Sequence, residues 1–585
     1  MKKLISILLC LTILTGTVAV GAVATEETVT EETEAIVWDG DPVIFLQGFT
    51  GSPLIKDQGL ETEETILGAG SEFDITKILT SLPGIIAGIV IYAITGDSEM
   101  LSTGFADLAA AKLDNMSCLP DGSSKYNVTT FPYYAKDASV ATLVENGQEA
   151  FIPEAGLTTA IREYVPDESL YIFNNDWRMG QVENAESLDR FIGEVLEITG
   201  KDKVDIYALS HGGQLAATYL YYHGTEGEVD NVVLNVPSIC GTSIVNGLLG
   251  DGAANFSMDE ISRFLSVMLQ TEADLRFLGK ILPGEFLNKL LKVVFVEVFQ
   301  PVALNFGSIW DFMNIETYNN YKAKYLDPTV NAGIIEKADK MHYDCMANIG
   351  EGLRAAQASG VSISIMSNHG TRLGSGESID ADFVIDTAST SGAYAAAFGA
   401  RFADNYTPKY TVCDDKSHNH ISPSRTVDAT CAYLPENTWF INGQYHGQAA
   451  YDSYSLSLLL KLLLTDDIKD IYSDPDYPQF ELAQCPVDAV YAKFTNTVSG
   501  RFTAETDTLL IRNISKEHTL VIRSLEADGV EFDIEKKTAV APGEEILIPC
   551  SGLEDEDFIE VEMVYARKGK PLSSPYTKTF YFTAA

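Results

Sequence analysis

The segment Lys203–Gln214 constrains this chain most, because it predicts a strand, a sharp turn and a helix in direct succession. Residues 204–208 alternate between apolar and more polar side chains, as in a strand, and residues 215–221 have the pattern of a helix. Ser210 lies at the apex between them. A strained turn of this kind exposes a serine hydroxyl, and the first N–H groups of the helix can stabilise an anion beside it. We therefore interpret Ser210 as a nucleophile, with an ordinary turn as the alternative.

The N-terminal residues 1–24 predict a secretory signal peptide. Two lysines precede a short apolar run, Leu4–Leu14, which is followed by small residues that end at Ala24. This order predicts cleavage after Ala24, and the run is short for a bilayer span. The Thr- and Glu-rich residues 25–36 predict a disordered acidic spacer. We therefore expect a secreted, extracellular protein.

Length and charge limit the classes of protein that fit. With 585 residues the chain can form two or more domains and a large core. A formal net charge of −43 repels nucleic acid, so no nucleic-acid partner is expected.

The eight cysteines are widely spaced, and no spacing resembles a structural zinc site. Cys413 and Cys431 flank a polar segment, which predicts a disulfide in an exported protein.

Residues 37–480 predict an α/β domain with a mostly parallel sheet covered on both faces, because apolar strands alternate with helices. The predicted strands are 41–46, 169–173, 204–209, 231–236, 361–366 and 439–441. The predicted helices are 156–164, 188–199, 343–359 and 454–464.

Two apolar segments interrupt this alternation, at about residues 78–96 and 258–327. We interpret both as lid or cap insertions over an apolar pocket. A bilayer span remains an alternative for the first segment, and additional core remains an alternative for the second.

The first predicted strand ends in a glycine-rich turn, Gln47–Leu54. In acyl-transfer enzymes such a turn supplies a second donor to the developing oxyanion. We therefore predict that the backbone N–H groups of Phe49 and His211 form an oxyanion hole. The alternative is an ordinary turn from a strand into a loop.

A serine hydroxyl needs a neighbouring base to remove its proton, and that base needs an orienting carboxylate. His446 follows a predicted strand end and precedes the last helix, where the sheet returns a loop over Ser210. We predict His446 as the base, with a purely structural loop histidine as the alternative.

The irregular insertion 393–435 contains a second group of polar residues. His418 and His420 lie close in sequence to Asp414 and Asp415, as metal ligands often do. The pattern is more typical of a solvated loop than of a metal cluster. The sequence therefore predicts no metal and no cofactor.

Taken together, these motifs resemble an α/β-hydrolase of the lipase group, closest to the lecithin–cholesterol acyltransferase-like and related bacterial lipases. The resemblance spans about residues 40–465. The matching motifs are Gln47–Ser52, Asp176–Arg178, Val204–Gly213, Pro237–Ser243, the turn that starts at Asp382, and His446 with Gly447.

This resemblance implies an α/β-hydrolase fold and a triad in the chain order Ser210, Asp382, His446. Asp386 and Asp428 remain rivals of Asp382 as the acid. The family contains lipases, phospholipases and acyltransferases, so the substrate is left open.

Three departures from the family pattern also leave the substrate open. Ala208 replaces a glycine, Gln47 stands where histidine or proline is frequent, and the loop after Asp382 is long. We expect the Asp176–Arg178 motif to be structural, with Trp177 packing and Arg178 pairing below the site.

From residue 485 to 585 the sequence changes to short alternating strands separated by turn residues. This pattern predicts an antiparallel β-sandwich of immunoglobulin-like type. It carries no evident chemistry, so the expected role is binding a surface glycan or bracing the enzyme.

The functional expectation is a secreted serine esterase or lipase that hydrolyses carboxylic esters through an acyl-enzyme. Its expected partner is an acyl ester or lipid, with transient contact at a lipid interface. Two alternatives are acyl transfer to an alcohol and a non-catalytic surface-binding protein on a hydrolase fold.

Overall fold

The protein is described by a computed structural model of the 585-residue chain. The structure describes residues 38–67, 114–153, 156–245, 300–374, 377–415, 418–449 and 452–483. It also describes the C-terminal segments 490–495, 508–513, 519–527, 530–531, 538–541, 544–549, 558–567, 570–571 and 576–581. The predicted signal peptide, spacer and first lid lie outside these residues, as does the second insertion up to residue 299.

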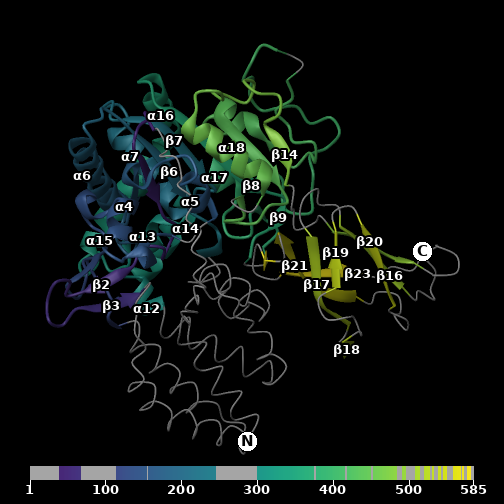
Figure 1. Cartoon of the computed structure of the whole chain (residues 1–585), viewed down its shortest axis with the longest axis horizontal. Helices are drawn as coiled ribbons and strands as arrows, with labels where there is room; N and C mark the ends of the chain where they lie inside the picture. Colours follow the sequence, from purple (N-terminus) through teal and green to yellow (C-terminus); the bar gives the residue numbers. More distant parts are fainter. Residues whose placement is uncertain are drawn as a thin grey trace, which may run out of the picture.

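The centre of the fold is a seven-stranded sheet whose strand pairs are all parallel (Figure 1). In spatial order the strands are β14 (Phe480–Leu482), β13 (Thr438–Asn442), β8 (Ser362–His369), β7 (Val229–Asn235), β6 (Val204–Leu209), β1 (Val43–Leu46) and β5 (Leu170–Phe173). The parallel sheet confirms the predicted α/β class. Strand β14 was not predicted.

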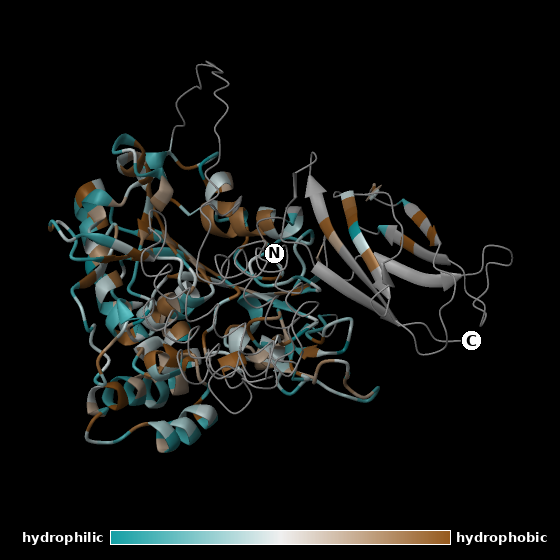
Figure 2. Ribbon diagram, turned by 90° about the horizontal axis from the view of Figure 1, so that it is seen from below, coloured by the Kyte–Doolittle hydropathy of each residue, from teal (hydrophilic) through white to brown (hydrophobic). Residues whose placement is uncertain are grey.

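Helices cover both faces of this sheet. On one face, α6 (Gln181–Thr199), α7 (His211–His223) and α16 (Ala347–Ala358) pack in one core cluster with strand residues such as Ile44 and Leu46. On the other face, α4 (Val140–Glu145), α5 (Gly156–Ile161) and α18 (Ser453–Leu464) pack with Val43 and Phe45. Figure 2 shows brown and teal alternating along helices of this domain, as expected where one helix face is apolar.

Helix α6 begins seven residues before its predicted start, at Gln181. Gly180, its N-cap residue, has no side chain to cap the helix. Instead, Oδ2 of the distant Asp311 accepts the Gln181 N–H at 2.6 Å. A tertiary contact therefore sets this boundary, which local sequence signals do not contain.

The remaining elements of the α/β region are short. They include the three-stranded sheet of β2 (Leu54–Lys56), β3 (Glu64–Leu67) and β4 (Val128–Thr130), and the strand pairs β9 (Thr371–Arg372) with β10 (Asp380–Ala381) and β11 (Tyr394–Ala395) with β12 (Val427–Asp428). The helices are α12 (Gln300–Ala303), α13 (Gly307–Asp311), α14 (Ile315–Tyr325), α15 (Ala332–Asp339) and α17 (Thr387–Ser391), and a π-helical stretch, Lys340–Met346, precedes α16. Within the described residues, no helix has the length and apolarity needed to cross a membrane.

The C-terminal region contains two antiparallel sheets. One consists of β15 (Val490–Thr495), β16 (Thr508–Asn513) and β20 (Glu545–Pro549). The other consists of β17 (Thr519–Ala527), β18 (Val530–Glu531), β19 (Thr538–Val540), β21 (Phe558–Arg567), β22 (Lys570–Pro571) and β23 (Tyr576–Tyr581). The all-β character agrees with the sequence pattern, while the immunoglobulin-like assignment stays a prediction.

The predicted disulfide between Cys413 and Cys431 is wrong, because both residues are free thiols. The two cysteines are held by different neighbours. The Cys413 sulfur lies 3.4 Å from Nδ1 of His418, whereas Cys431 ends a 3₁₀ turn, Ala429–Cys431, that the Asp428 side chain caps. Whether two cysteines can pair depends on their separation in space, which the spacing in the sequence does not give.

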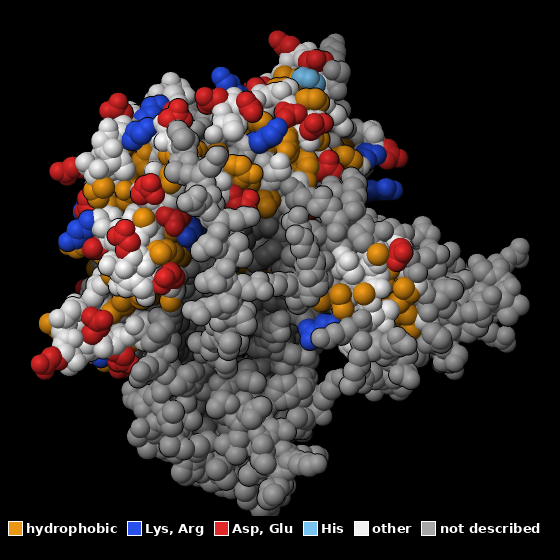
Figure 3. Space-filling view, viewed as in Figure 1, with side chains coloured by type: hydrophobic (Ala, Val, Ile, Leu, Met, Phe, Trp, Pro, Cys, Tyr) orange, Lys and Arg blue, Asp and Glu red, His pale blue; other side chains and the backbone are white. Residues whose placement is uncertain are grey.

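The described surface is strongly acidic. On the face shown in Figure 3, Asp and Glu side chains are spread over the described part and outnumber Lys and Arg. This distribution fits the formal net charge of −43 and is unfavourable for binding nucleic acid.

Candidate active site

The candidate site lies at the carboxyl ends of β1 and β6. Strand β5 lies beside β1 at the edge of the sheet, and β6, the next strand of this sheet along the chain, lies on the other side of β1, so the order of the strands reverses there. Loops that leave such a switch point separate and create a crevice for a ligand. The loop after β1 contains Phe49, and the turn after β6 contains Ser210.

Ser210 occupies a strained turn between β6 and α7. Its φ of 57° and ψ of −114° are unusual for a residue with a side chain. The turn needs the two glycines that follow, because a Cβ on Gly212 would lie 2.6 Å from the Gln47 carbonyl oxygen. A Cβ on Gly213 would lie 2.5 Å from Cβ of Pro237. This close packing holds the serine hydroxyl at the start of α7.

Ser210, His446 and Asp382 form a continuous hydrogen-bonded relay. Oγ of Ser210 lies 2.9 Å from Nε2 of His446, and Nδ1 of His446 lies 2.7 Å from Oδ2 of Asp382. The backbone N–H of His446 also donates to the Asp382 carbonyl oxygen at 2.9 Å. The Asp382 side chain is 1% exposed, so its interaction with the imidazole is little screened by water. The structure therefore brings together the three residues that the sequence predicted.

The acid loop holds the Asp382 carboxylate in a fixed orientation. Oδ1 accepts the backbone N–H groups of Val384 at 2.9 Å and Ile385 at 2.7 Å, which leaves Oδ2 for the imidazole. Phe383, between Asp382 and Val384, has a φ of 85°, so backbone strain accompanies the tight turn.

Two residues that the sequence analysis gave no role fasten this acid loop. The Thr242 hydroxyl donates to the Val384 carbonyl oxygen at 2.6 Å, and the Ser243 N–H donates to Oδ2 of Asp386 at 2.7 Å. Both lie in the Pro237–Ser243 motif. The sequence contains this motif, but it does not show that the motif contacts the acid loop. Asp386 is therefore a buried anchor of the loop, and burial raises the pKa of its carboxyl group.

Asp428, the other rival for the acid, lies within the insertion and is fully buried. Its Oδ2 accepts the Tyr406 hydroxyl at 2.8 Å and the Lys409 N–H at 3.0 Å. Its Oδ1 accepts the hydroxyl and the N–H of Thr430 at 2.6 and 3.0 Å. These four bonds place Asp428 in a structural role, with no contact to His446 among them.

The predicted oxyanion donors lie on the two segments that adjoin Ser210. A Cβ on Gly48 would lie 3.5 Å from Cβ of Ser210, so the loop that carries Phe49 passes directly beside Ser210. His211 is the first residue of α7, where N–H groups point outward from the helix. Both predicted donor residues therefore lie next to Ser210, one on the neighbouring loop and one directly after it in the chain.

The His211 side chain cannot replace His446 as the base. Its ring is fully buried, and burial lowers its pKa to about 3. The ring packs against Phe49, with centroids 5.5 Å apart, and against Phe312 at 4.9 Å. Neither ring nitrogen has a hydrogen-bond partner among the described residues.

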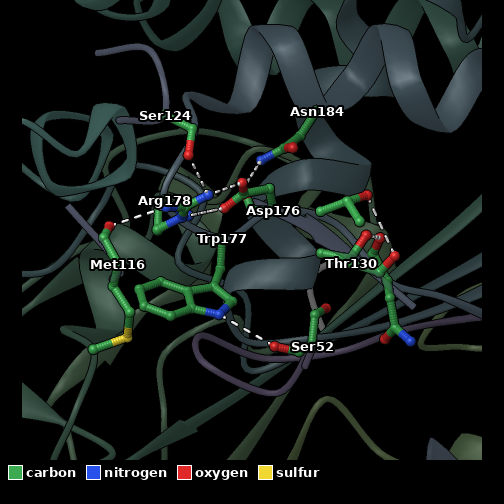
Figure 4. Close-up of polar contacts among 10 residues, drawn as sticks. Ser52, Met116, Ser124, Thr130, Asp176, Trp177, Arg178 and Asn184 are labelled. Atoms are coloured by element: carbon green, nitrogen blue, oxygen red, sulfur yellow. Dashed lines mark hydrogen bonds and ion pairs between the residues drawn. The ribbon is translucent and has the colours of Figure 1, made fainter. Parts of the chain in front are cut away.

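The Asp176–Arg178 motif is structural, as expected from the sequence. Figure 4 shows the Arg178 guanidinium in a fork on the Asp176 carboxylate, with nitrogen–oxygen distances of 2.9 and 2.6 Å. The same guanidinium donates to the Met116 carbonyl oxygen and the Ser124 hydroxyl. Nε1 of Trp177 donates to the Ser52 carbonyl oxygen at 3.2 Å, which ties the motif to the oxyanion loop.

We expect Arg178→Met to lower the free energy of unfolding of the α/β domain by about 3–5 kcal/mol. The Arg178 side chain is fully buried and the Asp176 side chain is 17% exposed, so the substitution leaves a largely buried carboxylate unpaired. The measurement is urea unfolding followed by tryptophan fluorescence, because all four tryptophans (Trp38, Trp177, Trp310 and Trp439) belong to this part of the chain.

Arg162→Met is the matched control for this substitution. Arg162 also forms a two-pronged ion pair, with Asp167, but both side chains are about one third exposed. Exposed pairs contribute about 0–1 kcal/mol, so the control should change the midpoint little. Equal losses in the two variants would contradict a special role for Arg178.

Two groups of described residues have the geometry to hold a metal ion, but neither contains a triad residue. Asp189, His223 and Glu226 form the first group, on and after the helices α6 and α7. Asp41, Asp205 and Asp230 form the second, at the amino end of β6, opposite Ser210. Protein contacts account for both groups: His223 lies beside Asp189 and Glu226, and Asn231 donates two hydrogen bonds to the buried Asp205.

Comparisons with known proteins give no family assignment. No family model matches the sequence, and no curated protein matches it. A carboxylesterase structure from the ammonia-oxidising thaumarchaeon Nitrososphaera gargenis is 13% identical, covers 36% of this chain and 67% of its own, and has a TM-score of 0.18. Phospholipase PlaB from Legionella pneumophila is 9% identical, with coverages of 78% and 90% and a TM-score of 0.28. At such TM-scores neither likeness bears on function, which depends on this chain's own geometry.

Proposed function

We propose that this protein is a serine esterase or lipase of the α/β-hydrolase type, with Ser210, His446 and Asp382 as its catalytic triad. The observation that carries the proposal is the relay from Oγ of Ser210 through both nitrogens of His446 to the Asp382 carboxylate. The chain order of the three residues and the parallel sheet beneath them are those of the lipase-group hydrolases that the sequence resembles.

In the proposed acylation step, Oγ of Ser210 attacks the ester carbonyl carbon while Nε2 of His446 accepts the hydroxyl proton. Asp382 accepts the Nδ1–H of His446 and stabilises the imidazolium that forms. The N–H groups of Phe49 and His211 bind the negative oxygen of the tetrahedral intermediate. The carbon–oxygen bond to the alcohol then breaks, and His446 returns the proton to the departing alcohol.

In the proposed deacylation step, water attacks the acyl-enzyme on Ser210. His446 accepts a proton from the water and later returns a proton to Oγ of Ser210. The products are a carboxylic acid and the regenerated serine. An alcohol in place of water would give the acyltransferase alternative from the same intermediate.

The substrate that the site favours has an apolar acyl group. Four aromatic side chains lie beside the oxyanion loop, and we name them the aromatic wall: Phe49, Trp177, Phe306 and Phe312. Phe49 lies at its centre, 5.0 Å from the ring of Trp177 and 5.1 Å from that of Phe312. Trp177, Phe306 and Phe312 are buried and Phe49 is half-buried, so an acyl chain that reaches this loop would leave water for the exposed part of Phe49.

We also propose a location for the protein and a role for each part of the chain. Residues 1–24 are proposed to direct secretion, and residues 37–480 to form the catalytic domain. Residues 485–585 are proposed to bind a surface glycan or to brace the enzyme. The physiological partner is then an extracellular ester or lipid, reached by transient contact with a lipid interface.

We expect kcat/KM to rise across p-nitrophenyl esters from acetate to longer acyl chains. Each buried CH₂ is worth up to about 0.8 kcal/mol, which corresponds to about fourfold in kcat/KM per carbon over the first few carbons. The measurement is initial rate against substrate concentration for each ester, with the Ser210→Ala variant as the blank.

The shape of this series distinguishes the two parts of the proposal. A maximum at acetate with a sharp fall afterwards would remove the lipase assignment and leave a serine esterase for compact acyl groups. Rates with the wild-type protein that equal the blank for every ester would contradict both parts.

A further inference from the structure

A group of metal-ligating side chains lies outside the active site, on the insertion. The Cys413 sulfur is 3.4 Å from Nδ1 of His418 and 3.5 Å from Nε2 of His420. His420 is only 6% exposed, so the solvated loop expected from the sequence is wrong for this residue. His418 is exposed, at the outer side of the group.

The hydrogen bonds around His420 fix which ring nitrogen has a free lone pair. Nε2 of the buried Gln479 donates to the carbonyl oxygens of Pro435 at 2.7 Å and Thr438 at 3.4 Å. Its Oε1 therefore faces Nδ1 of His420, at 2.8 Å, and must accept the Nδ1–H. Nε2 of His420 consequently presents a lone pair toward the Cys413 sulfur and the Tyr472 hydroxyl oxygen, which is 3.3 Å away.

The His418 ring also has one nitrogen near the Cys413 sulfur and the other near a side-chain oxygen. Its Nε2 lies 3.7 Å from Oδ2 of Asp415, while its Nδ1 faces the sulfur. The ring stacks on Tyr472, with centroids 4.3 Å apart and planes 15° from parallel. Histidine ligands of metals characteristically direct their second nitrogen to a carboxylate or carbonyl oxygen in this way.

We propose that Cys413, His418 and His420 form a binding site for a zinc-class divalent ion. The sulfur has three polar neighbours, the two imidazole nitrogens and the Asp415 carbonyl oxygen at 3.6 Å, and a metal ion would accept lone pairs from the sulfur and from both nitrogens. Zinc bonds of about 2.3 Å to sulfur and 2.0–2.1 Å to nitrogen put a sulfur and a nitrogen ligand about 3.6 Å apart at a tetrahedral angle, close to the two sulfur–nitrogen distances of 3.4 and 3.5 Å.

Unlike the two groups described above, these three residues do not have all their ligand atoms within 4.8 Å of one another, so binding requires a movement of an imidazole ring and releases one proton. The ring centroids of His418 and His420 are 6.5 Å apart, so the rings must approach each other for both nitrogens to reach one ion. His418 is the more exposed of the two rings, and it would have to slide along its stack on Tyr472 to approach His420. The Cys413 thiol loses its proton to solvent as the sulfur–metal bond forms. Water or the Tyr472 hydroxyl completes four-coordination.

The consequence of this site is structural. The ligands lie on the insertion, and the hydrogen bond to Gln479 connects them to the residue immediately before β14 at the edge of the sheet. A bound ion would fasten the insertion to that edge. The triad residues do not take part, so hydrolysis of a small ester should proceed at an unchanged rate in variants of the site.

The test uses the full chain, stripped with a chelator and then titrated with Zn²⁺ against a competing chromophoric chelator, and separately with Co²⁺. We expect about one Zn²⁺ per chain that depends on Cys413, and a sulfur-to-cobalt charge-transfer band with Co²⁺. Cys413→Ser should abolish the band, and Gln479→Leu should weaken affinity about 10–100-fold. Cys431→Ser, a half-buried thiol of the same insertion, is the matched control and should leave both unchanged.

Circular dichroism and turnover of a small ester check that each variant is folded. Binding without a charge-transfer band, or equal affinity in Cys413→Ser, would assign the ion to an acidic group instead and overturn the proposal. A second outcome would also overturn the proposal: no ion binds, and Zn²⁺ does not slow the reaction of the Cys413 thiol with a thiol reagent. The group would then be a thiol–imidazole pair.

Discussion

Ser210→Ala is expected to reduce kcat for ester hydrolysis on the order of 10⁶-fold. The substitution removes the only atom that can form the acyl-enzyme, while the imidazole of His446 then has no hydroxyl to deprotonate. Alanine fits the strained turn no worse than serine, because the positive φ of the position is a property of the backbone. The measurement is the burst and steady-state rate with p-nitrophenyl butyrate.

A fluorophosphonate probe gives a second measurement that does not depend on substrate choice. It should label the wild-type protein at Ser210 and leave Ser210→Ala unlabelled. Ser187→Ala is the matched control, since its hydroxyl donates to the Glu183 carbonyl oxygen on α6 and contacts no residue of the relay. If Ser210→Ala retained full activity, the triad proposal would fail, and a non-catalytic binding protein would become the better hypothesis.

The parts of the site that could be predicted from sequence are those that local patterns encode. The change from strand to helix around Ser210 is visible in the hydrophobic period, and Gly212 and Gly213 are required by contacts within a few ångströms of the turn. His446 could be predicted because a parallel sheet delivers the ends of its strands to one edge, and β13 ends four residues before it.

Tertiary contacts account for what could not be predicted. The start of α6 depends on the Asp311 carboxylate, 130 residues away in the chain. The burial of His420 depends on Gln479, which lies 59 residues away. The partners of Cys413 are side chains rather than another thiol, and neither propensity nor spacing contains that information. Sequence patterns therefore predicted candidate residues, while long-range contacts determined which groups meet.

Asp382→Asn is expected to lower kcat by up to about 10⁴-fold with little change in folding. The asparagine amide would keep the bonds from the Val384 and Ile385 N–H groups through its oxygen, and would present an NH₂ group to Nδ1 of His446. The imidazole would then carry its proton on Nε2, facing Ser210, where it cannot act as a base. The measurement is kcat with a short ester, together with the urea midpoint of each variant.

Asp428→Asn is the control that separates the two carboxylates left open by the sequence. Asp428 accepts four hydrogen bonds within the insertion, from Tyr406, Lys409 and Thr430. Its substitution should therefore lower the urea midpoint while kcat stays within a fewfold of wild type, because the Tyr406 hydroxyl and the backbone donors lose a charged acceptor. The opposite result, a large loss of kcat in Asp428→Asn and a small one in Asp382→Asn, would transfer the role of the triad acid to Asp428. Since the structure puts the His446 imidazole 2.7 Å from Asp382, such a result would also require the acid loop to rearrange when substrate binds.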